Sequence, residues 1–195
     1  MTPLWISTTN QGKLSEFKNI LGDQIEIHSV AELGSYSAPP ETGKTFEDNA
    51  RIKARTLRAM KPGLWVVADD SGLEADGLGG MPGIHSARYA GDKAGDAENV
   101  AKLLKMIQIR AGSNRKAQMT CVLVAFDPQG KEHVIHGVIQ GQIAIAARGK
   151  GGFGYDPVFI PEGHDKTYSE LGPAVKNQTS HRSQAIRKLL PLIQA

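Results

Sequence analysis

Short apolar runs alternate with amphipathic stretches along the first part of the chain. Apolar patterns typical of strands cover residues 4–8, 25–30 and 64–68, and apolar residues at helical spacing cover 14–21 and 46–60. The run at 64–68 is unbroken, which is typical of a strand that is buried on both faces. This interleaving of strands and helices predicts an α/β fold.

The second half of the chain continues the same pattern. A turn at Asp127–Gly130 joins two apolar runs as a hairpin, so the predicted sheet is mixed and not purely parallel. The expected elements are a helix over 96–107, strands over 117–126, 131–139, 141–147 and 158–160, and a last helix that begins at His181 after a capping Ser180.

Size and composition favour one soluble globular domain over residues 1–195. A net charge of +3 fits an anionic small molecule, and only 6% aromatic residues argue against a nucleic-acid partner. Cys121 is the single cysteine and lies in an apolar run, so we expect a buried thiol. The N-terminal residues lack the basic and long apolar regions typical of a secretory signal, and no apolar run has membrane-spanning length, so we expect a cytoplasmic protein with no membrane partner.

Two adjacent aspartates, Asp69 and Asp70, follow the most apolar predicted strand. Neighbouring carboxylates repel each other, so a positive group must hold them, and hard oxygen ligands suit Mg²⁺ or Mn²⁺. The residues from Ser71 to Gly91 are rich in glycine, which lets backbone approach a ligand closely. The alternative is an ordinary polar turn with solvated aspartates.

Two lysines are candidates for phosphate binding. The strand at 4–8 enters a polar turn that opens a helix, a natural anion cradle, and Lys13 adds a positive charge there. Lys53 lies one helical turn after Asn49 and faces the same side. Each lysine can instead be an ordinary solvated helix residue.

Two glycine motifs are misleading. The segment from Gly149 to Gly154 matches the dinucleotide fingerprint, but Pro157 and a strand follow it where that fold needs a helix. Gly43-Lys44-Thr45 resembles the end of a P-loop, but Ala38 stands where the motif requires glycine. Neither segment therefore predicts its usual nucleotide fold.

Five segments in a fixed order resemble the inosine triphosphate pyrophosphatase family, which hydrolyses non-standard purine nucleoside triphosphates. They are STTNQGK (7–13), PETGKTFEDNA (40–50), ADDSGLEADGLGGMPGIHSARYAG (68–91), GKGGFGYDPVF (149–159) and KNQTSHRSQA (176–185). The resemblance implies an elongated mixed β-sheet flanked by helices, with two lobes around a central substrate cleft. It also implies hydrolysis of dITP, ITP or XTP to the monophosphate and pyrophosphate, dependent on Mg²⁺ (Mn²⁺ possible), in a homodimer.

The resemblance further implies roles for individual residues. Asp70 would be the general base and would bind metal together with Glu41 and Asp69. The substrate would be bound by the phosphate cradle and two further contacts, namely Thr8, Thr9, Asn10, Gln11, Gly12 and Lys13 with Lys53 and Ser71. The base and sugar pocket would be lined by Phe153, Gly154, Tyr155 and Asp156, and the base edge would be read by Lys176, His181 and Arg182.

This chain departs from the family pattern at a few positions. Thr9 stands where many members have glycine, and Asp48 stands where glutamate is frequent. Two alternatives stay open, a related pyrophosphatase with a different base preference and a nucleotide-binding module without turnover. The intact aspartate pair and Glu41 argue against the second.

Overall fold

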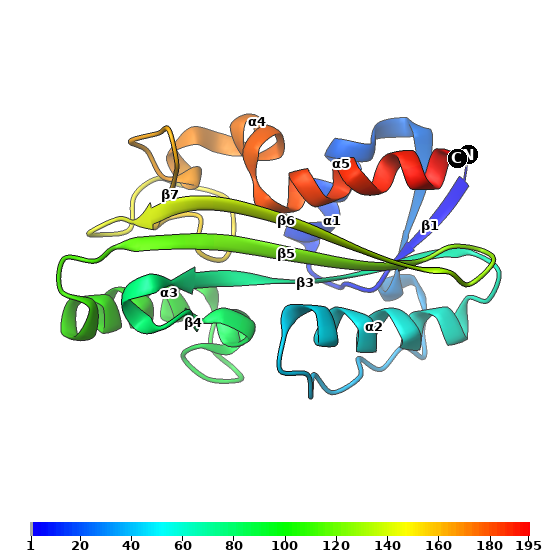
Figure 1. Cartoon of the computed structure of the whole chain (residues 1–195), viewed down its shortest axis with the longest axis horizontal. Coiled ribbons are helices and arrows are strands. Elements are labelled where there is room, and N and C mark those ends of the chain that lie inside the picture. Colours follow the sequence, from blue (N-terminus) through cyan, green and yellow to red (C-terminus); the bar gives the residue numbers. More distant parts are fainter. Residues whose placement is uncertain (1) are drawn as a thin grey trace. The chain divides into compact units, whose positions relative to one another are not determined.

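The computed structural model describes residues 2–195 (Figure 1). Its strands are β1 (Thr2–Ile6), β2 (Ile25–Ser29), β3 (Trp65–Ala75), β4 (Met81–Pro82), β5 (Lys116–Phe126), β6 (Glu132–Ile143) and β7 (Phe159–Pro161). Its α-helices are α1 (Gln11–Leu21), α2 (Phe46–Met60), α3 (Asp96–Met106), α4 (Tyr168–Thr179) and α5 (His181–Gln194). No helix within residues 2–195 is long and apolar enough to cross a membrane.

One mixed sheet contains all seven strands found in residues 2–195, which confirms the predicted α/β class. The order is β2-β1-β3-β5-β6-β7, and β4 pairs with β3. β1 runs parallel to both β2 and β3, whereas β3 with β4 and β6 with β7 are antiparallel.

The chain divides into two compact units. The first unit comprises the chain up to Asp70 together with Cys121–Gly137 and Arg182–Ala195, and the second unit comprises Ser71–Thr120 and Val138–His181. The single domain over 1–195 and the cleft between two lobes stay predictions.

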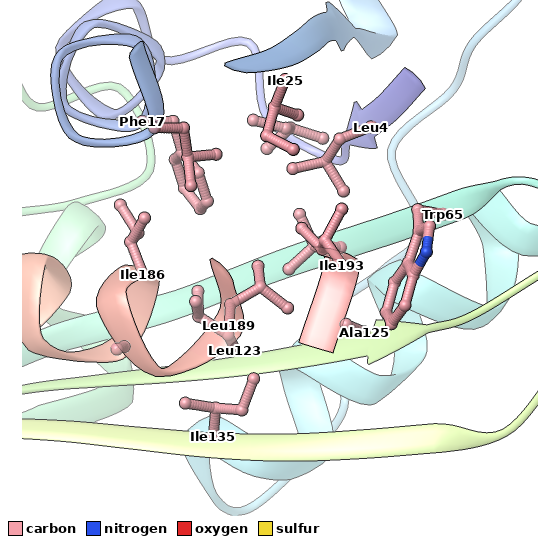
Figure 2. Packing of buried hydrophobic residues seen from close by; sticks show 14 of the residues in the cluster. Leu4, Phe17, Ile25, Trp65, Leu123, Ala125, Ile135, Ile186, Leu189 and Ile193 are labelled. Carbon is pink, nitrogen blue, oxygen red and sulfur yellow. The ribbon is translucent and has the colours of Figure 1, made fainter. Parts of the chain in front are cut away.

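Strand alternation divides the core of the first unit into two clusters. One cluster joins Leu4, Val67 and Leu123 to the apolar faces of α1 and α5 (Figure 2). The other joins the neighbouring strand positions, such as Val66 and Val124, to α2. Because successive strand residues point to opposite faces, α2 covers one face and α1 with α5 cover the other.

The second unit has its own core. Leu73 and Ala75 of β3 pack with Leu103 of α3, Phe159 of β7 and Tyr168 of α4. Phe159 and Tyr168 stack with ring centroids 5.9 Å apart. This apolar packing holds β7, which follows the glycine-rich segment, in the core of the second unit.

A lysine side chain contacts one edge of the sheet. β7 pairs with β6 over Gly141–Ile143, so the earlier part of β6 forms an edge of the sheet. Lys188 of α5 reaches this edge, and its Nζ donates to the carbonyl oxygen of His136 at 2.7 Å.

Two sequence-based expectations about elements were wrong, and one helix was not expected. β3 does not end before Asp69 but continues to Ala75, because sheet pairing does not require apolar side chains. The predicted strands 131–139 and 141–147 are largely one strand, β6. Helix α4 was not predicted, because Gly172 and Pro173 are typical helix breakers, and the residue Gly172 indeed leaves helical geometry with φ of 81°.

We expect Leu123→Ala to lower the free energy of unfolding by about 2 to 5 kcal/mol, because the side chain is fully buried and its loss leaves a cavity. Urea unfolding measures the change. Val138→Thr, at a position that is 37% exposed, should change stability by less than about 0.5 kcal/mol. Equal losses in both variants would contradict the described packing.

Candidate active site

Asp69 and Asp70 lie inside β3, so their side chains point to opposite faces of the sheet. Both are buried, with 1% and 7% of their surfaces exposed. Asp69 faces α1 and α5, which supply its ion partners, and Asp70 faces α2, which supplies Lys53. This differs from the expectation that the two carboxylates face one cation.

Each oxygen of Asp69 has a cationic partner. The Lys13 ammonium pairs with Oδ1, and Nε of Arg182 donates to Oδ2 at 2.7 Å. The thiol of Cys121 also donates to Oδ2, with Sγ at 3.2 Å. Burial raises the pKa of Asp69, but the charges of Arg182 and Lys13 outweigh burial and hold that pKa well below its usual range. These two cations therefore stabilise the ionised form of Asp69.

Arg182 is enclosed between two carboxylates. Only 2% of its surface is exposed, and its NH1 pairs with Glu16 of α1 while its Nε pairs with Asp69. The role that the resemblance implies for Arg182, reading the base edge, stays a prediction. Glu16 was not singled out from sequence, although an acidic residue between Leu14 and Phe17, in the apolar part of a helix, signals a buried partner.

Lys53 joins the other two acidic residues. Its Nζ lies 2.7 Å from Oδ1 of Asp70 and 3.1 Å from Oε1 of Glu41. Burial lowers the pKa of Lys53, but the charges of Asp70 and Glu41 outweigh burial and raise it above its ordinary value. Burial raises the pKa of Asp70, and the charge of Lys53 opposes that rise without cancelling it. Lys53 is therefore protonated, and Asp70 is the more basic of the two adjacent aspartates.

Glu41 and Asp70 are the residues best placed to hold a divalent cation. Residues 2–195 contain no cluster of three or more His, Cys, Asp or Glu side chains arranged for a metal. These two carboxylates nevertheless converge on one positive charge, and Oδ2 of Asp70 is buried with no hydrogen-bond partner in the described structure. Mg²⁺ commonly binds through one or two carboxylates, with water and substrate phosphates completing its shell. The residues fit such an ion.

The loop before α1 has the form predicted for an anion cradle. Asn10 caps the helix, with Oδ1 accepting from the amide of Lys13 at 3.0 Å, and Thr8 accepts from the amide of Asn10 at 3.2 Å. Thr9, Asn10 and Gln11 are exposed and Gly12 is half-buried. The first amides of a helix and a nearby lysine suit phosphate oxygens.

The second unit brings together three residues that were predicted for the base pocket. Asp156 is buried and accepts from Nζ of Lys176 at 2.6 Å and from the amide of Phe153 at 3.0 Å. Lys176 Nζ also lies 4.1 Å from the centre of the Phe153 ring. A half-buried aromatic ring is thus held beside a cation, which is a cation–π contact.

Two other residues predicted for the base pocket, Tyr155 and Gly154, form hydrogen bonds to other segments of the second unit. Tyr155 is buried and its hydroxyl donates to the carbonyl of Ser86 at 2.8 Å. The amide of Gly154 donates to Asp96 at 2.6 Å, which fixes the segment to the start of α3. His181 is buried at the first position of α5, and Ser71 is half-buried in β3.

We expect Arg182→Leu to lower the free energy of unfolding by about 3 to 5 kcal/mol, because Asp69 and Glu16 would lose a shared buried cation. Urea unfolding at neutral pH measures the loss. Arg55→Leu provides the control, since Arg55 is exposed and its ion pair with Glu132 is long, at 3.8 Å. Wild-type stability of Arg182→Leu would contradict the buried network.

Comparison with known proteins identifies the family. The model of the Ham1 family matches residues 4–192. The dITP/XTP pyrophosphatase of Bdellovibrio bacteriovorus is 51% identical over 98% of this chain and 97% of its own length, and that of Bacillus subtilis is 43% identical over 97% and 96%.

Solved structures of Ham1 proteins are also similar to this chain. A HAM1 protein from Coxiella burnetii has a TM-score of 0.89 and 39% identity, over 100% of this chain and 99% of that one. The Staphylococcus aureus Ham1 protein has a TM-score of 0.86 and 38% identity, over 99% and 98%. The chain therefore belongs to the Ham1 family.

Proposed function

We propose that this protein hydrolyses non-standard purine nucleoside triphosphates (dITP, ITP and XTP) to the monophosphate and pyrophosphate. Family relatives that are 42% to 51% identical over nearly the whole chain are named dITP/XTP pyrophosphatases. The observation that carries the proposal is the Lys53 ammonium between Asp70 and Glu41, because it combines a base, a cation site and a phosphate contact.

Asp70 accepts the proton of the attacking water in this proposal. The water oxygen attacks the α-phosphorus, the bond from that phosphorus to the α–β bridging oxygen breaks, and the pair of electrons leaves with pyrophosphate. Burial raises the pKa of Asp70, which makes it a better proton acceptor than an exposed aspartate. Its unpartnered Oδ2 supplies an acceptor for that water.

Positive groups of the first unit would stabilise the leaving pyrophosphate. Phosphoryl transfer depends mainly on positioning and on neutralising charge. Lys13 and the first amides of α1 are suited to the outer phosphates, and Lys53 is suited to a third contact. Glu41 and Asp70 would hold Mg²⁺ (or Mn²⁺), which supplies charge neutralisation at the phosphate oxygens when bound.

The resemblance implies that Asp69 binds metal, but we assign it another role. Both of its oxygens engage cations from α1 and α5, so we assign it to positioning Lys13. Arg182 supports that arrangement from inside the protein, and its burial favours this role over base reading.

Phe153, Asp156 and Lys176 are the residues that we assign to the purine. A ring such as Phe153 can stack on a base, and a Lys176 ammonium held by Asp156 can donate to a 6-oxo group. It cannot accept from the 6-amino group of adenine, and an unpaired buried donor can discriminate by roughly 10⁴-fold at best. A homodimer stays a prediction from the resemblance, and a cytoplasmic location stays a prediction from the sequence pattern.

The test is an Mg²⁺-dependent assay of dITP, ITP, XTP, dGTP, dATP, dUTP and dTTP that measures pyrophosphate and orthophosphate separately. We expect pyrophosphate from dITP, ITP and XTP, no orthophosphate, and loss of activity with EDTA. A preference for dUTP or dTTP would favour the related pyrophosphatase with another base preference. Binding without release of pyrophosphate would favour the module without turnover.

We expect Asp70→Asn to lower kcat by at least about 10²-fold, because an amide cannot accept the proton from water. Nucleotide affinity in the absence of turnover should change much less, as measured by isothermal titration with dITP. Asp23→Asn, at an exposed position, is the matched control and should keep full activity. Wild-type turnover by Asp70→Asn would reject Asp70 as the base.

A further inference from the structure

Glu41 lies in a loop and yet must meet groups that are held by regular elements. No helix or strand covers residues 33–45, whereas Lys53 is on α2 and Asp70 is on β3. Oε1 of Glu41 is nevertheless 3.1 Å from Lys53. A carboxylate on a loop keeps such a position only if the loop itself is attached to the rigid elements.

The loop is attached to α2 two residues after Glu41. The amide of Gly43 donates to Oδ1 of Asn49 at 2.9 Å. A Cβ atom at Gly43 would lie 2.5 Å from Cβ of Asp48 and 2.7 Å from Oδ1 of Asn49, closer than real atoms approach. The hydrogen bond therefore requires glycine at this position, because any side chain would push the loop away from the helix.

The side chain of Asn49 is oriented for its hydrogen bond with the Gly43 amide. Its side chain is fully buried, and Nδ2 finds no acceptor among residues 2–195. The Gly43 amide needs an acceptor, so the amide group is oriented with its oxygen toward the loop. Burying Nδ2 of Asn49 without an acceptor is unfavourable. The contribution of Asn49 to the fold is therefore its Oδ1, which accepts from the Gly43 amide.

The same face of α2 carries both attachments. Asn49 and Lys53 are one helical turn apart, so the residue that holds the loop and the residue that contacts Glu41 are neighbours on α2. The amide of Lys44 adds a longer bond of 3.3 Å to Asp48. Asn49→Asp would also accept from the Gly43 amide, but it would add a carboxylate on the face of α2 that carries Lys53.

We propose that Asn49, together with Gly43, is a positioning residue that holds the Glu41 carboxylate toward Lys53 and Asp70 and thereby sets the affinity for the divalent cation. The proposal rests on the proposed function, since it assumes that Glu41 and Asp70 bind that ion. Residues that orient metal ligands typically change metal affinity by 10- to 100-fold when replaced.

The test measures Mn²⁺ binding to the full chain by electron paramagnetic resonance, without nucleotide. We expect Asn49→Ala and Gly43→Ala each to raise the Kd for Mn²⁺ by about tenfold or more. Asn49→Asp keeps the acceptor and should bind Mn²⁺ as well as the wild type or more tightly. Thr42→Ala, at an exposed position of the same loop, is the matched control and should leave Kd unchanged.

Hydrogen exchange of the Gly43 amide provides a second measurement that does not depend on metal. It should become faster in Asn49→Ala and stay slow in Asn49→Asp. Wild-type Kd and wild-type exchange in Asn49→Ala would overturn the proposal, as would a loss in Asn49→Asp equal to that in Asn49→Ala. An absence of Mn²⁺ binding by the wild type would overturn it too.

The nucleotide assay separates this proposal from the proposed function. If the wild type releases pyrophosphate from dITP but Asn49→Ala binds Mn²⁺ normally, the positioning role fails and the proposed function stands. If the variants lose Mn²⁺ affinity as expected but no nucleotide yields pyrophosphate, the positioning role stands and the proposed function fails.

Discussion

The buried charge of Asp69 is the constraint on which the first unit depends. A carboxylate with 1% of its surface exposed is stable only if cations replace its lost hydration, and Lys13 and Arg182 supply them. These partners come from α1 and α5, near opposite ends of the chain. Burial of one anion therefore fixes the helix that opens the phosphate cradle against the strand that carries Asp70.

Strand alternation places the two adjacent aspartates on opposite faces of the sheet, where they have different partners. Asp69 points toward the helices that enclose it, and Asp70 points toward α2, where Lys53 and Glu41 lie. Their pKa values consequently shift in opposite directions, downward for Asp69 and upward for Asp70. Consecutive residues of one strand thus provide a carboxylate stabilised as an anion and a more basic carboxylate.

Local pattern predicted much of the fold, and the resemblance supplied the residues of the candidate site, but neither gave the contacts between distant segments. Apolar periodicity indicated α1, α2 and β5, and the motif resemblance indicated Asp70 and Lys53. The division of the aspartate pair was missed because it depends on β3 extending past Asp70, which cross-strand pairing decides and apolarity does not. The buried partner Glu16 was missed for a similar reason, since it is 166 residues away from Arg182 in sequence.

The lysine that reaches the outer edge of β6 has a consequence for the protein in concentrated solution. An open strand edge offers unpaired backbone groups to any other chain, and such edges promote β-type self-association. Lys188 occupies the carbonyl of His136 and adds a charge at that edge. That edge therefore has one acceptor fewer for another chain and one positive charge more, and both features oppose pairing with another strand.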